Sequence, residues 1–325
     1  AYYKLNNNIT ASTAITPIGD FSNPFNGKFN GSGFIISGKI TGGSYSGLFG
    51  NIASEAEIKM LGVNIDVTGT DNVGGLIGNA NGGTVDQCYS SGSVKSTNTV
   101  DGNAGGLVGT AISTKISDCY ATSNVTGGKS LGGLAGNSSG AKFTNCYTTS
   151  ANFSGGTTAS CTNCYSVGSS TSVSGLTIKT LAQMSDGTLV FLLNGTNNSS
   201  PLFGEKINYY PVLTNVGEGK GIGVPCKVTI TQTQTDSGTI KILNGITEVK
   251  SGDYVDKNTT LTIQSTPKTG FELTSLKVGG TSLLTTSFSV TSDVTIEPTF
   301  SKIETYAIKV SKNDGGTVTP SDANV

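Results

Sequence analysis

The pentapeptide Gly74-Gly75-Leu76-Ile77-Gly78 decides the fold, because it recurs with a Cys-Tyr pair at a fixed offset. Its two further copies are Gly105-Gly106-Leu107-Val108-Gly109 and Gly132-Gly133-Leu134-Ala135-Gly136. Fourteen residues after the first glycine of each copy come Cys88-Tyr89, Cys119-Tyr120 and Cys146-Tyr147. A weaker copy precedes them at Gly47-Leu48-Phe49-Gly50, and Cys164-Tyr165 remains of a later one. A period of 27–31 residues with a constant internal offset predicts stacked structural repeats.

The composition allows a folded repeat protein and excludes several classes of function. The chain has 325 residues, of which 46 are glycine and only 13% are charged, and its net charge is −1. It contains no histidine and no arginine. Without a basic field or arginine side chains, a nucleic-acid partner is excluded. Without histidine, Ser-His and Cys-His nucleophile pairs are excluded as well. No apolar run approaches the roughly 18–20 residues of a membrane span.

The repeat predicts a parallel β-helix over residues 1–170 of an all-β chain. One coil cannot bury its apolar face alone, whereas coils stacked about 4.8 Å apart close a backbone ladder and bury aligned apolar columns. One inward column is expected from Leu48, Leu76, Leu107 and Leu134. A second is expected from Cys88, Cys119, Cys146 and Cys164, of which the first three are expected to be free thiols. Right-handed crossovers dominate parallel β connections, which favours a right-handed helix.

The glycines and tyrosines of the repeat have separate expected roles. Glycine permits the positive φ values of tight corners. The structural corners are therefore assigned to Gly75, Gly78, Gly106, Gly109, Gly133 and Gly136. Strand alternation places Tyr89, Tyr120 and Tyr147 on the face opposite the cysteines. These rings either pack in a core or form an outward column for sugars or proteins, and as such a column they are the predicted ligand-binding residues.

No catalytic residue, cofactor or metal site is predicted. Cys161 and Cys164 form a Cys-x-x-Cys pair, but no second ligand pair completes a zinc site. A disulfide between these two cysteines stays an open alternative. Asp71 and Asp101 precede glycine pentapeptides in predicted loops, where a solvated turn residue is favoured over a ligand of calcium.

The ordered series of glycine pentapeptides and Cys-Tyr strands resembles the GLUG motif of bacterial surface proteins. The leading segments Pro24-Phe25-Asn26-Gly27 and Phe29-Asn30-Gly31-Ser32-Gly33 are similar to the opening coils of such solenoids. The resemblance extends over roughly residues 1–215. It implies a surface-protein solenoid of the kind found in large adhesins, and it supplies no catalytic residues.

The rest of the chain divides at changes of pattern. Residues 171–216 are expected to form a short helical cap over the open end of the β-helix and a return strand. Residues 217–225 are glycine-rich and predict a linker. The Thr/Val/Ile alternation of residues 226–302 predicts a small antiparallel β module, and its segments resemble the divergent internalin-type B-repeat. Residues 303–325 are expected to begin a second, truncated copy.

These resemblances imply a non-catalytic adhesin or binding scaffold that is secreted or held at the bacterial cell surface. Its expected partners are host or microbial glycans or surface proteins. Two alternatives remain: a carbohydrate-active β-helix, and the non-catalytic region of a surface peptidase. A polysaccharide lyase or glycoside hydrolase needs carboxylates clustered in a groove. The chain opens within a strand pattern at Ala1-Tyr2-Tyr3, which indicates a piece of a longer protein.

Overall fold

The computed structural model describes residues 1–156, 158–168, 173–195, 201–233 and 235–305. By their contacts these residues form two compact units. The first comprises the described residues of 1–227 and 254–258, and the second comprises those of 228–253 and 259–305. The expected second copy of the B-repeat falls mainly on residues 306–325, which lie outside the described residues.

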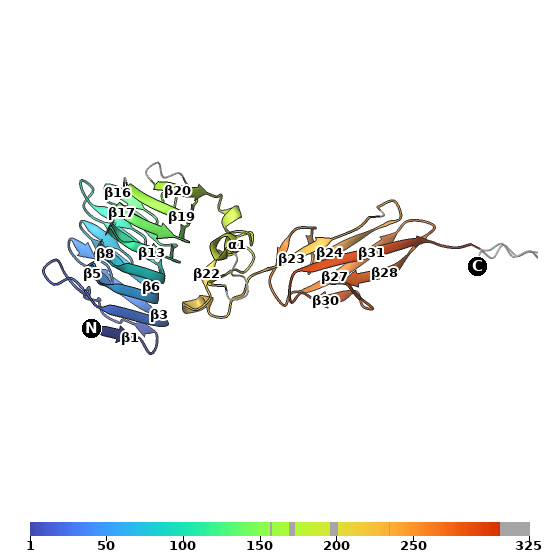
Figure 1. The fold of residues 1–325 in the computed structure, drawn as a ribbon, viewed down its shortest axis with the longest axis horizontal. Helices are drawn as coiled ribbons and strands as arrows, with labels where there is room; N and C mark the ends of the chain where they lie inside the picture. Colours follow the sequence, from blue (N-terminus) through green and yellow to red (C-terminus); the bar gives the residue numbers. More distant parts are fainter. Residues whose placement is uncertain (157, 169–172, 196–200, 234, 306–325) are drawn as a thin grey trace, which may run out of the picture. The chain divides into compact units, whose positions relative to one another are not determined.

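The first unit is a parallel β-solenoid of about five turns (Figure 1). One coil consists of β7 (Asn72–Gly74), β8 (Ile77–Asn81), β9 (Thr84–Ser91) and β10 (Ser93–Ser96). The next coil consists of β11 (Asn103–Gly105), β12 (Val108–Ile112), β13 (Lys115–Ser117), β14 (Tyr120–Ala121) and β15 (Asn124–Gly127). Strands at equivalent positions of the two coils pair in parallel. The predicted parallel stack is therefore confirmed.

The remaining strands extend this stack in both directions. Before it lie β1 (Tyr2–Lys4), β2 (Ile9–Thr10), β3 (Lys28–Thr41), β4 (Tyr45–Ser46), β5 (Phe49–Ile52) and β6 (Glu57–Gly69). After it lie β16 (Ser130–Gly132), β17 (Ala135–Thr144), β18 (Tyr147–Thr148), β19 (Thr158–Ser166) and β20 (Val173–Ile178). Because β20 pairs in parallel with β19, the stack continues past residue 170, the limit that the sequence pattern suggested.

The solenoid interior contains the predicted leucine and cysteine columns. Leu48 is 2% exposed, and Leu76, Leu107 and Leu134 are fully buried. Cys88, Cys119, Cys146 and Cys164 are fully buried in the same apolar cluster. Backbone hydrogen bonds join successive coils beside the leucines, from Leu76 N–H to Leu107 O and from Leu107 N–H to Leu134 O, both at 3.0 Å. Stacking thus buries apolar surface that a single coil would leave in water.

The repeat glycines are structural, but for a different reason than the predicted one. Gly75, Gly106 and Gly133 have no positive φ, and the same holds for Gly78, Gly109 and Gly136. What forbids a side chain is the neighbouring coil. A Cβ on Gly106 would overlap the carbonyl oxygen of Gly133, and a Cβ on Gly109 would lie 2.5 Å from the carbonyl oxygen of Gly78. Close backbone approach between coils, rather than corner conformation, requires glycine here.

Positive φ values occur at other solenoid glycines, such as Gly82, Gly92 and Gly128, and at the residue directly before each cysteine of a Cys-Tyr pair. Gln87, Asp118, Asn145 and Asn163 have φ between 50° and 57°. Asp and Asn adopt this left-handed conformation more readily than most residues. Asn145 Nδ2 donates to Asp118 Oδ1 at 2.9 Å, and Asn163 Nδ2 donates to Asn145 Oδ1 at 2.8 Å. The bend that separates the inward cysteine from the preceding strand is therefore held by a column of side-chain hydrogen bonds.

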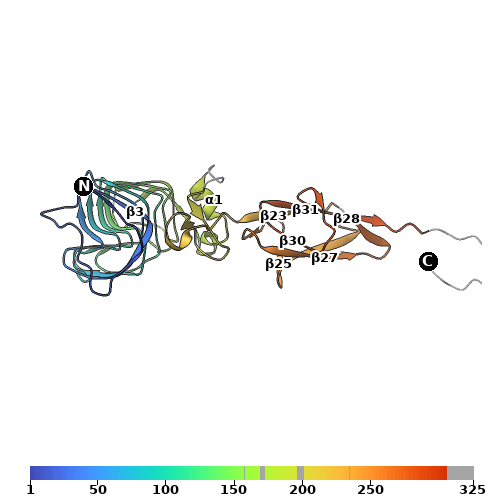
Figure 2. The same cartoon turned by 90° about the horizontal axis from the view of Figure 1, so that it is seen from below.

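A single non-repeated segment, which we call the strap, lies along one lateral face of the stack (Figures 1 and 2). The strap comprises residues 182–195 and 201–219. It contains η1 (Ala182–Met184), α1 (Leu189–Asn194), β21 (Phe203–Gly204), β22 (Val212–Leu213) and η2 (Gly217–Gly219).

The expected helical element is therefore present, but it covers a lateral face instead of the open end of the solenoid. The reason is an apolar tyrosine column on that face, against which α1 and the strands of the strap pack. Residues 217–219, predicted as linker, belong to the strap, because η2 lies beside β3.

The β module between Cys226 and Lys302, most of which forms the second unit, contains two small sheets. One has the order β25 (Thr247–Val249), β24 (Gly238–Asn244), β27 (Thr260–Pro267), β30 (Ser287–Ser289) and is antiparallel throughout. The other has the order β26 (Tyr254–Val255), β23 (Cys226–Ile230), β31 (Val294–Lys302), β28 (Phe271–Val278), β29 (Thr281–Ser282). Its β23 and β31 pair in parallel, whereas the other pairs are antiparallel. Buried Ile242, Leu261, Ile296 and Phe300 contribute to the core.

Candidate functional site

The strands β9, β14 and β18 align three tyrosines on the outer face of the solenoid. Tyr89, Tyr120 and Tyr147 are direct register partners in successive coils. Their ring centroids are 5.0 and 5.1 Å apart, and each adjacent pair of rings is 7° from parallel. We call this stack the tyrosine ladder. The rings face away from the cysteines, as strand alternation predicted, and form a second apolar cluster with the strap.

The tyrosine ladder is buried under the strap. Tyr89, Tyr120 and Tyr147 are 8%, 6% and 0% exposed. The hydroxyl of Tyr147 donates to the carbonyl oxygen of Pro211, and its ring meets that of Phe203 at a centroid distance of 6.4 Å. The flat faces that a ligand would need are therefore occupied by the neighbouring rings, and only ring edges and hydroxyl groups remain for contact with a ligand.

Burial also determines the protonation of the ladder. It raises the pKa of Tyr89 to about 12, with a further contribution from the Glu218 carboxylate. Burial likewise raises the pKa of Tyr120, to which Tyr89 and Glu218 add. The pKa of Tyr147 is raised well above its usual value by burial in the same way. The three hydroxyl groups are neutral near pH 7, as tyrosine is at its usual pKa, and the Tyr147 hydroxyl already donates to Pro211.

A pocket of about 360 Å³ lies beside the ladder, within the first unit. We call it the tyrosine pocket. One wall is the ladder together with a polar column formed by Ser37, Asn64, Ser91 and Thr122. The opposite wall belongs to the strap and includes Tyr209, Tyr210, Val212 and Glu218. The volume is at the lower end of the range for small-molecule sites.

The polar column follows from the strand period. Ser37 pairs with Asn64, and Asn64 pairs with Ser91, across β3, β6 and β9. Ser91 and Thr122 each come two residues after a ladder tyrosine, so they share its face. The regular solenoid therefore supplies one aromatic wall and one polar wall side by side.

The sequence identified the tyrosines of one wall of the pocket but not the strap residues that form the opposite wall. Tyr89, Tyr120 and Tyr147 were its predicted binding residues, and the structure brings all three to the tyrosine pocket. Their role in binding stays a prediction. Tyr209, Tyr210 and Glu218 were missed, because they lie in the non-repeated strap, where no period relates them to the ladder. Adjacent tyrosines at 209–210 before Pro211 were the one available signal.

The cysteines are packing residues of the protein interior. All six are free and buried in the structure, Cys161 and Cys164 included. Burial raises the pKa of the Cys119 and Cys146 thiols well above their usual value, which suppresses the nucleophilic thiolate. Within the described ranges, no group of three or more His, Cys, Asp or Glu side chains could hold a metal ion.

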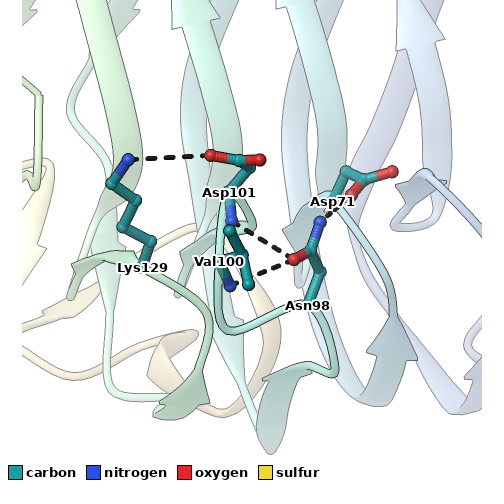
Figure 3. A network of polar contacts seen from close by, with 5 residues as sticks. All are labelled: Asp71, Asn98, Val100, Asp101 and Lys129. Atoms are coloured by element: carbon teal, nitrogen blue, oxygen red, sulfur yellow. Dashed lines mark hydrogen bonds and ion pairs between the residues drawn. The ribbon is translucent and has the colours of Figure 1, made fainter.

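Asp71 and Asp101, the aspartates considered for calcium, hold a loop in place (Figure 3). Asn98 Nδ2 donates to Asp71 Oδ1 at 2.6 Å, and Asn98 Oδ1 accepts the backbone N–H groups of Val100 and Asp101. Hydrogen bonds from Ser44 and Asn98 lower the pKa of Asp71. Asp101 forms an exposed ion pair with Lys129 at 3.6 Å. These contacts fix the turn before β11 and leave the two carboxylates pointing to different partners.

Comparison with known families agrees with both resemblances drawn from the sequence. The GLUG motif matches residues 101–126, which contain the glycine pentapeptide at 105–109 and Cys119-Tyr120. The divergent InlB B-repeat domain matches residues 228–304. The chain therefore carries a GLUG motif within a β-solenoid and a divergent InlB B-repeat domain. No curated protein and no solved structure is significantly similar to the chain. None of the described helices is long and apolar enough to cross a membrane.

Proposed function

We propose that this chain is a non-catalytic binding region of a secreted or cell-surface bacterial protein, and that it acts as an adhesin or binding scaffold. The observation that carries the proposal is the combination of a GLUG-type solenoid and a divergent InlB B-repeat domain in one chain. Domains of this kind fit a β-rich surface protein. The expected partners are glycans or proteins outside the bacterial cell.

The solenoid has physical properties that suit binding. Its strands are tied by parallel ladders into one unit, so side chains at equivalent positions of successive coils form fixed columns. A rigid array of this kind binds with little loss of conformational entropy. The tyrosine pocket adds a concave place with aromatic and polar walls.

A polysaccharide-cleaving enzyme is the alternative function, and the tyrosine pocket does not favour it. Glycoside hydrolases need two carboxyl groups, about 5–5.5 Å or about 6.5–9.5 Å apart depending on mechanism. Among the residues that line the tyrosine pocket, Glu218 is the single carboxylate. The arrangement therefore suits binding of a ligand better than acid-base catalysis with a pair of carboxylates.

The test separates binding from turnover. The full chain is incubated with plant, mucin and bacterial polysaccharides and with host extracellular-matrix proteins, and both retention and release of reducing or unsaturated ends are measured. We expect saturable retention on at least one surface without product release. Product release that is abolished by replacing one aspartate of the solenoid would refute the non-catalytic reading. Absence of retention on every surface would refute the binding role.

A further inference from the structure

We propose that the tyrosine pocket binds a pyranose sugar without negative charge, either neutral or carrying an amino group. In this complex Tyr209 packs on the apolar face of the sugar ring and the Glu218 carboxylate accepts hydrogen bonds from its hydroxyl or amino groups. The inference rests on the proposed function and deepens it, because it assigns a site and a ligand class to a chain otherwise proposed only to bind.

The aromatic surface available to a ligand comes from the strap. Tyr209 is 67% exposed although it lines the pocket, whereas the rings of the ladder are buried. Tyr210, beside it, is half-buried. A tyrosine ring offers a flat apolar face and a polar tip, which matches a pyranose with C–H groups on one face and hydroxyl groups at its edge. Tyr209 is therefore the side chain best placed to stack on a sugar.

The polar wall has unused hydrogen-bonding capacity. The structure shows no hydrogen bond to the side chains of Ser37, Asn64 or Thr122 from any residue that it describes. Ser91 makes one long bond, from its hydroxyl to the carbonyl oxygen of Val63 at 3.4 Å. Hydroxyl and amide groups both donate and accept, as sugar hydroxyls do. The column can therefore exchange bonds to water for bonds along the edge of a sugar.

The charge of the pocket selects against anions. Its lining residues include one acidic side chain, Glu218, and no lysine. The nearest basic neighbour in sequence, Lys220, places its ammonium group over the Phe34 ring at 4.5 Å. Lys206 does not line the tyrosine pocket, but it lines an adjoining cavity of about 310 Å³ that shares Tyr209, Tyr210, Val212 and Glu218 with it. A sialic acid or uronic acid carboxylate would therefore face Glu218 without a lining cation.

A lysine side chain of a protein partner is the competing occupant. It would satisfy Glu218 and contact the aromatic rings. It would, however, leave the polar column of Ser37, Asn64, Ser91 and Thr122 facing an aliphatic stem. Burying such groups without partners costs about 1–3 kcal/mol each. A sugar uses both walls of the pocket, which is why the observations favour it.

The experiment measures ligand binding to the full chain by saturation-transfer NMR and titration calorimetry. The neutral and amino probes are methyl glucoside, methyl galactoside, N-acetylglucosamine and glucosamine. Glucuronate and N-acetylneuraminate are the anionic probes, and N-acetyl-lysine amide represents a protein side chain. The variants are Tyr209→Ala and Glu218→Gln. Their matched controls are Tyr2→Ala, at a tyrosine that is 61% exposed away from the pocket, and Glu55→Gln, at an exposed glutamate.

We expect at least one neutral or amino sugar to bind, and each pocket variant to weaken it about ten-fold, about 1.4 kcal/mol. The controls should bind as the unchanged chain does, and thermal melting should show that all variants fold. Tighter binding of an anionic sugar or of the lysine probe would overturn the proposal.

Two further outcomes separate this proposal from the proposed function. Sugar binding that survives both pocket variants would place the ligand elsewhere and refute the site alone. No binding of any sugar probe, combined with retention of the chain on a polysaccharide or matrix surface, would also refute the site alone. Absence of both sugar binding and retention on every surface would refute the site and the proposed function together.

Discussion

Replacing Gly106 with alanine tests whether close approach of the coils explains the repeat glycines. Gly106 lies between β11 and β12, and its N–H donates to the carbonyl oxygen of Gly132 at 3.1 Å. Its own carbonyl oxygen accepts the N–H of Gly75 at 3.0 Å. An alanine Cβ here would overlap the carbonyl oxygen of Gly133 and lie 3.0 Å from the Cβ of Ala121. The coils must therefore move apart at the middle of the stack.

The expected cost has two parts. Overpacking by one carbon in a tight interior costs about 1–3 kcal/mol. Separating the coils also weakens the two backbone hydrogen bonds of Gly106, each with a net value of about 1 kcal/mol. The sum is about 3–5 kcal/mol of unfolding free energy. At about 2–4 °C per kcal/mol for a unit of this size, the melting temperature should fall by at least about 6 °C.

The assay is urea and thermal unfolding followed by circular dichroism and tyrosine fluorescence. Gly43→Ala is the matched control, because a Cβ at Gly43 would meet nothing within 4 Å and its φ is not positive. That substitution should leave stability unchanged or raise it by about 0.4–1 kcal/mol, since alanine restricts the unfolded chain. Equal stability of the Gly106→Ala and Gly43→Ala variants would refute the steric explanation.

Three other predictions concern the strap, the cysteines and a buried carboxyl group. Tyr147→Phe keeps the stacked ring but removes the hydrogen bond to Pro211, so it should lower the free energy of unfolding in urea by about 1 kcal/mol. Tyr147→Ala also removes the ring and should lower it by about 3–5 kcal/mol. Equal costs would contradict the packing role of the ring. The six buried thiols should resist a thiol reagent in the native chain and all react after denaturation without reductant, and fewer than four reactive thiols would contradict the free-thiol assignment. Burial raises the pKa of Glu205 from 4.5 to about 8, with Asp186 and Asp256 adding to the rise, so the native state keeps a proton that the unfolded chain loses. Its stabilising contribution is therefore full below about pH 4.5 and is lost as pH rises through about 8. Glu205→Gln should gain stability relative to the unchanged chain between pH 5 and pH 9, and a difference independent of pH would contradict this.

The repeated parts of the molecule could be predicted from the sequence because their determinants are periodic. Leu76, Leu107 and Leu134 recur at one offset, and a column of equivalent apolar residues is buried only when the coils stack in register. Strand alternation then placed Cys119 inside and Tyr120 outside without further information. The same local patterning, of period two between polar turns, indicated the separate β module that begins near Cys226.

The repeat glycines were correctly identified as structural positions, but the structure gives a different physical reason for them. The pentapeptide glycines were expected at corners with positive φ, yet positive φ belongs to other residues, such as Gly82, Gly92, Asp118 and Asn145. A sequence shows which positions exclude side chains, but not whether the backbone's own conformation or a neighbouring coil excludes them. The distance from Gly109 to the carbonyl oxygen of Gly78 exists only once the coils are stacked.

The second wall of the candidate site was decided by tertiary structure. The repeat of the solenoid aligned the tyrosines into a ladder. Whether the ladder faced water or protein depended on the strap, whose sequence is not repeated and does not predict where it packs. Asn215 reaches Gln87, and Pro211 reaches Tyr147, across 128 and 64 residues of chain. The strap covers the ladder and removes its apolar surface from water, together with its own apolar side chains. That burial is what brings Tyr209 and Glu218 to the polar column and creates the pocket.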